Sequence, residues 1–235
     1  MTRLLVVLLT ATIGIPGFSQ GPSTALNLIP EPVSQQLTGG RFTLPSTIVV
    51  EAPNLPELGH TLEELKTRLS APTGYTVTFT HEGNAAATIR LILNRTADAT
   101  LGAEGYTLTS TPTGVTIRAN KPAGIFYGLQ TLYQILPNEI ENSQPAKGVE
   151  WSAPCVTITD YPRFGWRGLM LDVARHYQPI SAVKRTLDDM EGLKFNVLHL
   201  HLSDDQGFRV ESNKFPKLQE DGSDGNYYTQ ADIRD

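Results

Sequence analysis

The sequence has little cysteine and no cluster of basic residues. Cys155 is the single cysteine among 235 residues, so no disulfide bond can form within the chain. The formal net charge is -5, and without a run of lysine or arginine this argues against a surface that binds nucleic acid. Charged residues make up 18% and hydrophobic residues 40%, which indicates an ordinary folded protein rather than a disordered one. A chain of this length has room for one or two domains.

Long apolar runs are also scarce. The run Leu4–Ile15 is shorter than the ~20 apolar residues that a membrane-spanning helix needs. Arg3 gives a positive start, and Gly17 and Ser19 have the small side chains that precede a cleavage site after Ser19. We therefore expect residues 1–19 to be a signal peptide, with an uncleaved anchor as the alternative. The mature protein is then secreted or periplasmic, and it has no membrane segment.

Residues 20–158 show the patterns of a small α+β domain. Apolar stripes at helical spacing predict two helices, at 55–69 and 122–136. Period-two alternation predicts strands at 41–50, 75–80, 87–93, 106–110 and 115–119. The last two of these strands form a hairpin across a Thr-Pro-Thr-Gly turn. We expect an antiparallel sheet that carries the two helices. We find no paired carboxylates, metal-ligand spacing or glycine-rich phosphate loop in this part of the sequence.

The character of the sequence changes after a polar, irregular stretch at 138–150, the best candidate for a linker between two domains, which we divide at 158/159. In the second part, 159–235, a helical pattern lies between two apolar runs: 168–173, 181–193 and 195–202. A strand, a helix and a strand within about 35 residues form a βαβ unit, hence a parallel sheet. We predict that apolar residues inside these strands, such as Leu169 and Met170, are core.

Polar side chains follow both of these strands, where ligand-binding groups gather in parallel βα folds. The first strand runs into Asp172, Arg175 and His176, and the second into His199, His201, Asp204, Asp205 and Gln206. Arg175 is a planar donor of several hydrogen bonds, suited to adjacent sugar hydroxyls or a carboxylate. Asp204 is an acceptor for hydroxyls or for a histidine N–H. We therefore expect Arg175 and Asp204 to bind a polyhydroxylated ring, supported by His176, His201 and Asp205.

Two other interpretations of these residues stay open. The polar clusters are also compatible with solvated loops that have no function. His199 and His201 are also compatible with core histidines whose hydrogen bonds are satisfied. Asp204 and Asp205 are adjacent, so on an extended backbone they point to opposite sides. They are therefore poor candidates for the facing acid/base pair that glycosidases use.

Two long segments resemble the glycoside hydrolases of family 20. They read Arg-Phe-Gly-Trp-Arg-Gly-Leu-Met-Leu-Asp-Val-Ala-Arg-His at 163–176 and Asn-Val-Leu-His-Leu-His-Leu-Ser-Asp-Asp-Gln-Gly-Phe-Arg at 196–209. The segments 215–218 and 228–234 continue the likeness, and 123–132 is similar to the end of that family's non-catalytic N-terminal domain. The resemblance implies an α+β domain followed by the first βαβ portion of a TIM (β/α)8 barrel, which this chain begins but does not complete.

The resemblance implies a β-N-acetylhexosaminidase, which removes terminal β-linked N-acetylglucosamine or N-acetylgalactosamine from glycans. In such enzymes the substrate's own acetamido oxygen attacks the anomeric carbon, an exception to the two-carboxylate scheme. Arg175 matches the arginine that holds sugar hydroxyls, and Asp204 matches an aspartate that supports the site. Leu200 and Phe208 depart from the family, whose members often carry Trp there. The family's catalytic Asp-Glu pair lies on a later strand, so we expect this chain alone to catalyse no hydrolysis. A barrel that is begun but not closed leaves strand edges unpaired, so we expect the C-terminal part to be poorly folded or prone to aggregate.

We expect no cofactor, no metal and no nucleic-acid partner, and no membrane partner after signal cleavage. The resemblance implies a glycan with a terminal N-acetylhexosamine as the partner. Two alternatives are a non-catalytic module that binds glycan or docks to another protein, and another exo-glycosidase family with a similar N-terminal domain. The preferred sugar, the linkage and the oligomeric state stay open.

Overall fold

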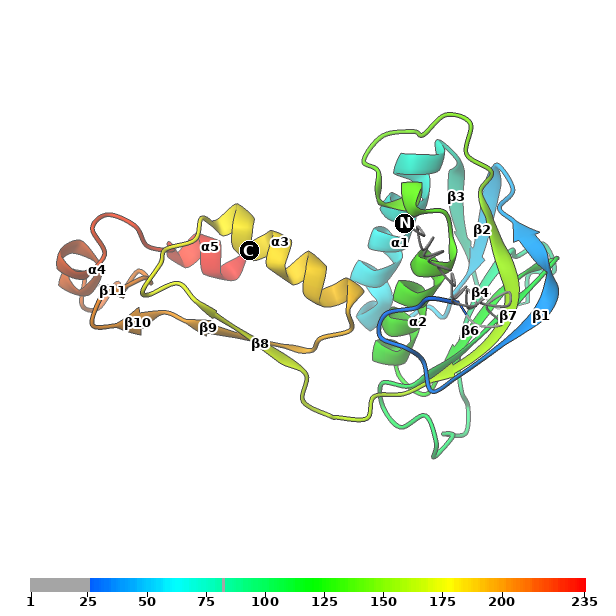
Figure 1. Ribbon diagram of the computed structural model, residues 1–235, viewed down its shortest axis with the longest axis horizontal. Helices are drawn as coiled ribbons and strands as arrows, with labels where there is room; N and C mark the ends of the chain where they lie inside the picture. The colour runs from blue at the N-terminus through cyan, green and yellow to red at the C-terminus, as the bar shows by residue number, and fades with distance from the viewer. Residues whose placement is uncertain (1–25, 82) are drawn as a thin grey trace, which may run out of the picture.

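The computed structural model describes residues 26–81 and 83–235, arranged as two units that are joined by the segment 161–167 (Figure 1). The predicted signal peptide at 1–19 lies outside the described residues. Within the described ranges, no helix has both the length and the apolar character needed to cross a membrane.

The first unit is a seven-stranded sheet with two helices packed on one face (Figure 1). The strands, in their order across the sheet, are β1 (Ser34–Thr43), β7 (Ser152–Asp160), β5 (Tyr106–Thr111), β6 (Gly114–Ala119), β4 (Ile89–Leu93), β2 (Thr47–Glu51) and β3 (Thr76–Thr80). The helices are α1 (Gly59–Thr73) and α2 (Pro122–Ile135), with single 3-10 turns η1 (Pro56–Leu58) and η2 (Asn138–Glu141) beside them. Both predicted helices and the β5–β6 hairpin are thereby confirmed.

The expectation of an antiparallel sheet was wrong, because the sheet is mixed. Strands β1, β7, β5 and β6 pair antiparallel, whereas β2 pairs parallel with β3 and β4, and β4 pairs parallel with β6. Helix α1 connects β2 to β3 as a crossover, which returns the chain to the same edge and makes the two strands parallel. Alternation in a sequence reports that one face of a strand is buried, not which way its neighbour runs.

The apolar stripe of α2 forms the centre of the core in this unit. Ile125, Leu129 and Leu132 are fully buried. The helix lies so close to the sheet that a Cβ on Gly128 would meet Cγ2 of Ile117 in β6 at 2.5 Å. Glycine at this position therefore permits the close contact between helix and sheet.

The segment 138–150 is a loop within the first unit, not a linker between the two units. After this loop the chain returns to the sheet as β7, which was not predicted as a strand and pairs with β1 and β5. The division at 158/159 falls inside β7, which continues to Asp160.

The second unit contains the predicted βαβ arrangement. Strand β8 (Gly168–Asp172), helix α3 (Ile180–Gly192) and strand β9 (Val197–His201) follow one another, and β8 pairs parallel with β9 so that Asp172 lies opposite His201. A short hairpin and two short helices complete the unit: β10 (Ser203–Asp204), β11 (Gly207–Phe208), α4 (Lys217–Gly222) and α5 (Gln230–Arg234). Its core is small, formed around the buried side chains of Val173, Val183 and Tyr228.

Two residues that were predicted as core are partly exposed. Leu169 is 39% and Met170 is 54% exposed. Among the described residues, β8 and β9 pair only with each other, so no further strand covers these side chains. That these strands are the start of an incomplete (β/α)8 barrel stays a prediction.

Two ion pairs with little exposure to solvent join the two units near the start of β8. The Lys194 ammonium donates to Oδ2 of Asp160 at 2.8 Å and to the Tyr106 hydroxyl at 2.7 Å, and only 8% of Lys194 is exposed. Arg167 pairs with Glu104 at 2.8 Å. Each pair joins the second unit, or the segment that leads into it, to the sheet or its loops.

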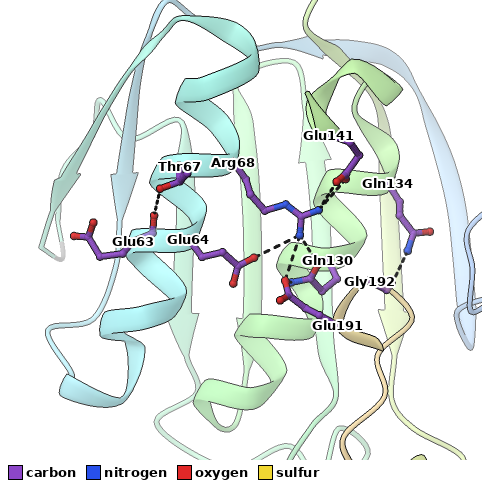
Figure 2. Close-up of polar contacts among 9 residues, drawn as sticks. All are labelled: Glu63, Glu64, Thr67, Arg68, Gln130, Gln134, Glu141, Glu191 and Gly192. Carbon is purple, nitrogen blue, oxygen red and sulfur yellow. Dashed lines mark hydrogen bonds and ion pairs between the residues drawn. The ribbon is translucent and has the colours of Figure 1, made fainter. Parts of the chain in front are cut away.

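A second cluster joins the end of α3 to α1 and α2, as Figure 2 shows. The Glu191 carboxylate accepts hydrogen bonds from Arg68 Nη1 at 3.2 Å and from Gln130 Nε2 at 2.7 Å. Arg68 also pairs with Glu64 at 3.5 Å and with Glu141 at 2.8 Å. One arginine is therefore surrounded by three carboxyl groups that come from both units.

Glu191 makes this cluster sensitive to pH. Burial raises the pKa of Glu191 to about 8, helped by the Glu64 carboxyl and opposed by Arg68 and Gln130. Because this folded pKa is above the ordinary value of 4.5, the folded state binds the proton more tightly than the unfolded chain does. The stability that comes from this proton is present below about pH 4.5 and is lost as the pH rises to about 8.

Replacing Glu191 with glutamine is expected to flatten the fall in melting temperature between about pH 5 and about pH 8, since the amide cannot titrate. Thermal unfolding of the two proteins across this range measures the effect. Glu63→Gln is the matched control, because Glu63 lies on α1 and points away from the cluster in Figure 2. An unchanged pH slope in Glu191→Gln, or an equal change in the control, would contradict the assignment.

Candidate functional site

The candidate site lies at the carboxyl ends of β8 and β9. The turn after β8 is tied to β9 because the backbone N–H groups of Val173 and Ala174 both donate to the carbonyl oxygen of His201 at 3.2 Å. This turn presents Arg175 beside the residues that follow β9. The strand-end rule for parallel sheets therefore describes this site.

Arg175 joins the two strand ends through its guanidinium group. Its Nη1 lies 2.6 Å from Oδ2 of Asp172, and its Nη2 lies 2.7 Å from Oδ2 of Asp204. The side chain is still 51% exposed. A guanidinium has five N–H groups, so donors are left for a ligand after both carboxylates are satisfied.

Asp204 is held as a carboxylate by three neighbours. The backbone N–H of Asp205 donates to Oδ1 at 2.8 Å, and Nε2 of His201 lies 3.0 Å from Oδ2. These hydrogen bonds, with the charge of Arg175 as a smaller cause, lower the pKa of Asp204 to about 2. The Arg175 N–H and guanidinium lower the pKa of Asp172 in the same way. The site therefore carries two fixed negative charges around one arginine.

The structure brings together most of the residues that the sequence singled out. Arg175, Asp204 and His201 are in direct contact, and Asp205 contributes its backbone N–H. His176 is exposed and makes no hydrogen bond or ion pair within the part of the chain that the structure describes.

The two histidines of β9 differ in their surroundings. His199 is exposed, whereas His201 is half-buried, and their rings lie 6.3 Å apart. His201 is paired with Asp204 rather than enclosed in an apolar core. The interpretation of His201 as a core histidine is therefore wrong.

Sequence reasoning assigned no role to Arg209, which is buried and donates to the carbonyl oxygen of Ala174, the residue before Arg175. It also missed Lys194 and Glu191, which join the two units. Each of these residues acts through partners that are distant in the sequence, such as the carbonyl oxygen of Ala174 for Arg209. No local pattern marks such contacts.

The arrangement suits the binding of hydroxyl groups. Arg175 offers donors, and Asp204 and Asp172 offer acceptors that stay ionised near neutral pH. Neither carboxylate is suited to deliver a proton, because a carboxyl group with a lowered pKa carries none at that pH. Residues 26–81 and 83–235 contain no group of three histidine, cysteine or acidic side chains placed to hold a metal ion.

A cavity of about 650 Å³ lies at the other end of β8, between the two units. It is lined by Lys194, Asp160, Arg167, Glu104 and apolar neighbours, and the predicted site residues do not line it. Four of its charged side chains are already paired, Arg167 with Glu104 and Lys194 with Asp160. We therefore assign this cavity to the junction of the units rather than to the candidate site.

Comparison with known proteins gives the family. The model of glycosyl hydrolase family 20, domain 2, matches residues 25–161, and the model of the family 20 catalytic domain matches residues 164–235. The chain belongs to glycoside hydrolase family 20. The resemblance of the two long segments is thereby confirmed, and this family 20 chain carries parts of both domains.

Relatives of this family 20 chain are named as hexosaminidases. It is 35% identical over 232 residues to a beta-hexosaminidase of Porphyromonas gingivalis, covering 94% of the chain and 29% of the relative. It is 33% identical over 217 residues to a beta-N-acetylhexosaminidase of Cellulomonas fimi, covering 88% and 42%. The chain spans less than half the length of these two proteins.

A solved structure has the same fold over the matched region. The Streptomyces plicatus N-acetyl-beta-hexosaminidase in complex with Thio-NAglucal matches with a TM-score of 0.78 and 37% identity. The match covers 88% of the chain and 42% of the Streptomyces protein. The mixed sheet and the helices described above are thus those of a family 20 protein.

Proposed function

We propose that the protein to which this chain belongs is a β-N-acetylhexosaminidase that releases terminal β-linked N-acetylglucosamine or N-acetylgalactosamine from glycans. The observation that carries the proposal is the 2.7 Å ion pair between Arg175 and Asp204, at the ends of two parallel strands. The names of the relatives, beta-hexosaminidase and N-acetyl-beta-hexosaminidase, support the same chemistry. The exposed arginine beside two ionised acceptors fits a ring with several hydroxyls.

In the proposed reaction, Arg175 and Asp204 hold the sugar while other groups break the bond. The acetamido oxygen of the bound sugar attacks the anomeric carbon, and the glycosidic oxygen leaves with a proton from a general acid. Water then opens the cyclic intermediate, so that the β configuration is retained. The general acid and the carboxylate that orients the acetamido group come from barrel strands after β9. His201 and Asp205 keep the Asp204 carboxylate oriented.

The test of this function is hydrolysis of p-nitrophenyl N-acetylglucosaminide. The complete product of the gene is expected to release p-nitrophenol, whereas a polypeptide of residues 1–235 alone is expected to stay at the background of buffer. The reason is that the described residues offer binding groups but no protonated acid at this site. Turnover by the 235-residue polypeptide would contradict the division of roles.

The alternative is a glycan-binding module without catalysis. It is favoured if the complete gene product binds N-acetylglucosamine but hydrolyses no N-acetylhexosaminide. The exposed N–H groups of Arg175 that bind neither Asp172 nor Asp204 suit this alternative equally well. Binding and turnover are therefore measured on the same preparation.

We also propose that the protein is exported, with residues 1–19 as the signal peptide. The supporting observation is the short apolar run Leu4–Ile15, which is followed by small side chains. N-terminal sequencing of the mature protein is expected to begin at Gln20. A cytoplasmic protein that keeps Met1 would refute export.

A further inference from the structure

Arg209 is a buried arginine whose guanidinium meets only backbone oxygen. The residue is 6% exposed. Every acceptor that the guanidinium meets in the described part of the chain is a carbonyl oxygen. Burying a charge without a counter-ion is costly unless all its donors are satisfied. The burial of this charge therefore calls for an explanation, which lies in the segments that Arg209 joins.

The carbonyl groups around Arg209 come from three separate segments. Nε and Nη2 of Arg209 donate to the carbonyl oxygen of Ala174 at 3.2 and 3.0 Å. Nε also donates to the carbonyl oxygen of Val173 at 3.2 Å. Nη1 donates to Ser223 at 2.6 Å and to Asn226 at 3.2 Å. Nη2 reaches Gln206 at 3.5 Å, and the backbone N–H of Arg209 bonds to Leu202 at 2.8 Å.

Two of these segments carry the candidate site. Ala174 directly precedes Arg175, and Gln206 lies two residues after Asp204. The remaining carbonyls belong to the loop 223–226, where Ser223 is fully buried. A single planar group therefore holds the turn that bears Arg175 against the hairpin that bears Asp204.

The space around Gly207 is a second indication that the hairpin and Arg209 fit together closely. A Cβ at Gly207 would lie 2.5 Å from Cζ of Arg209 and 2.6 Å from its Nε and Nη2. Contacts this short do not occur, so any larger residue at position 207 would displace the guanidinium. The glycine in the β10–β11 hairpin thus leaves the space that the Arg209 guanidinium occupies.

We infer that Arg209 is a positioning residue that sets the distance between Arg175 and Asp204, and thereby the affinity of the site for a terminal N-acetylhexosamine. This inference rests on the proposed function. Arg209 touches no ligand itself; it acts through the backbone of residues 173–174 and 206. The contrasting interpretation is that Arg209 stabilises the unit as a whole, with no particular effect on sugar binding.

The experiment uses the complete gene product and measures two quantities for each variant, the dissociation constant for N-acetylglucosamine and the melting temperature. The variants are Arg209→Met, Arg209→Lys and Gly207→Ala. Arg167→Met is the matched control, because Arg167 also donates to backbone carbonyls, of Lys194 and Phe164, but at the opposite end of β8.

Arg209→Met is expected to weaken sugar binding by about 10- to 100-fold, because a displaced Arg175 would lose hydrogen bonds from its charged donors to the sugar. Gly207→Ala is expected to change binding in the same direction without removing the charge. Arg209→Lys is expected to recover part of the affinity, because it keeps one charged donor. Arg167→Met is expected to lower the melting temperature and to leave the dissociation constant unchanged.

The inference is overturned if a folded Arg209→Met or Gly207→Ala protein binds N-acetylglucosamine as tightly as the wild type. It is also overturned if all three variants fail to fold while Arg167→Met folds, because Arg209 is then a general structural residue. Failure of the proposed function looks different: the wild type itself would not bind the sugar.

Discussion

Arg175→Ala in the complete gene product is expected to weaken the binding of N-acetylglucosamine by about 10- to 100-fold, the range for lost hydrogen bonds from a charged donor. The guanidinium uses one N–H group to pair with Asp172 and one to pair with Asp204. The others are available to sugar hydroxyls, because half of the side chain is exposed. The alanine variant removes these donors and also leaves two carboxylates that repel each other across the site.

Two further variants make this result specific to the fork of donors on Arg175. Arg175→Lys keeps the charge but not the planar pair of N–H groups, so an intermediate affinity is expected. Arg185→Ala, which removes an exposed arginine from α3, is the control for the loss of one positive charge. Binding that is unchanged in Arg175→Ala, measured by calorimetric titration, would remove Arg175 from the sugar site.

Lys194→Met is expected to lower the free energy of unfolding by about 3–5 kcal/mol, the range for breaking a buried ion pair by removing one partner. Asp160 and the Tyr106 hydroxyl would both lose the ammonium that they share. The side chains of Lys194 and Asp160 are only 10% and 13% exposed, so water replaces the lost contact poorly. Lys194 has a φ of 60°, which methionine would share, and the variant therefore tests the ammonium rather than the backbone.

Urea unfolding of the complete gene product measures the effect, with Lys66→Met on the exposed surface of α1 as the matched control. The double variant Lys194→Met/Asp160→Asn is expected to lose less stability than the two single variants added together, because each single change leaves a buried partner unpaired. A loss in Lys194→Met as small as in Lys66→Met would show that the pair does not hold the units together.

The elements that were predicted correctly are those whose signal is local. Helix α2 has its stripe of Ile125, Leu129 and Leu132, and β8, α3 and β9 follow one another within a short stretch. The direction of the strands in the first sheet depends on the crossover through α1, which alternation does not encode. Strand β7 was missed because it contains Pro154, which weakens a strand pattern. The structure accommodates Pro154 opposite Arg41, where the register between β1 and β7 shifts.

The candidate site was partly predictable for the same reason. The rule that ligand groups gather at strand ends finds Arg175 and Asp204 from sequence alone, since each lies a few residues after the end of β8 or β9. Arg209 escapes this rule because its partners are backbone carbonyls of residues 173, 174, 223 and 226. Lys194 and Glu191 escape it because their partners lie on the other unit, more than thirty residues earlier in the chain.

The most direct test of the account is a crystal structure of the complete gene product with N-acetylglucosamine bound. We predict sugar hydroxyls within hydrogen-bond distance of the Arg175 guanidinium, with Asp204 still paired to Arg175 and His201. A sugar bound elsewhere, with Arg175 engaged only by Asp172 and Asp204, would contradict the claim that the two strand ends form the sugar site.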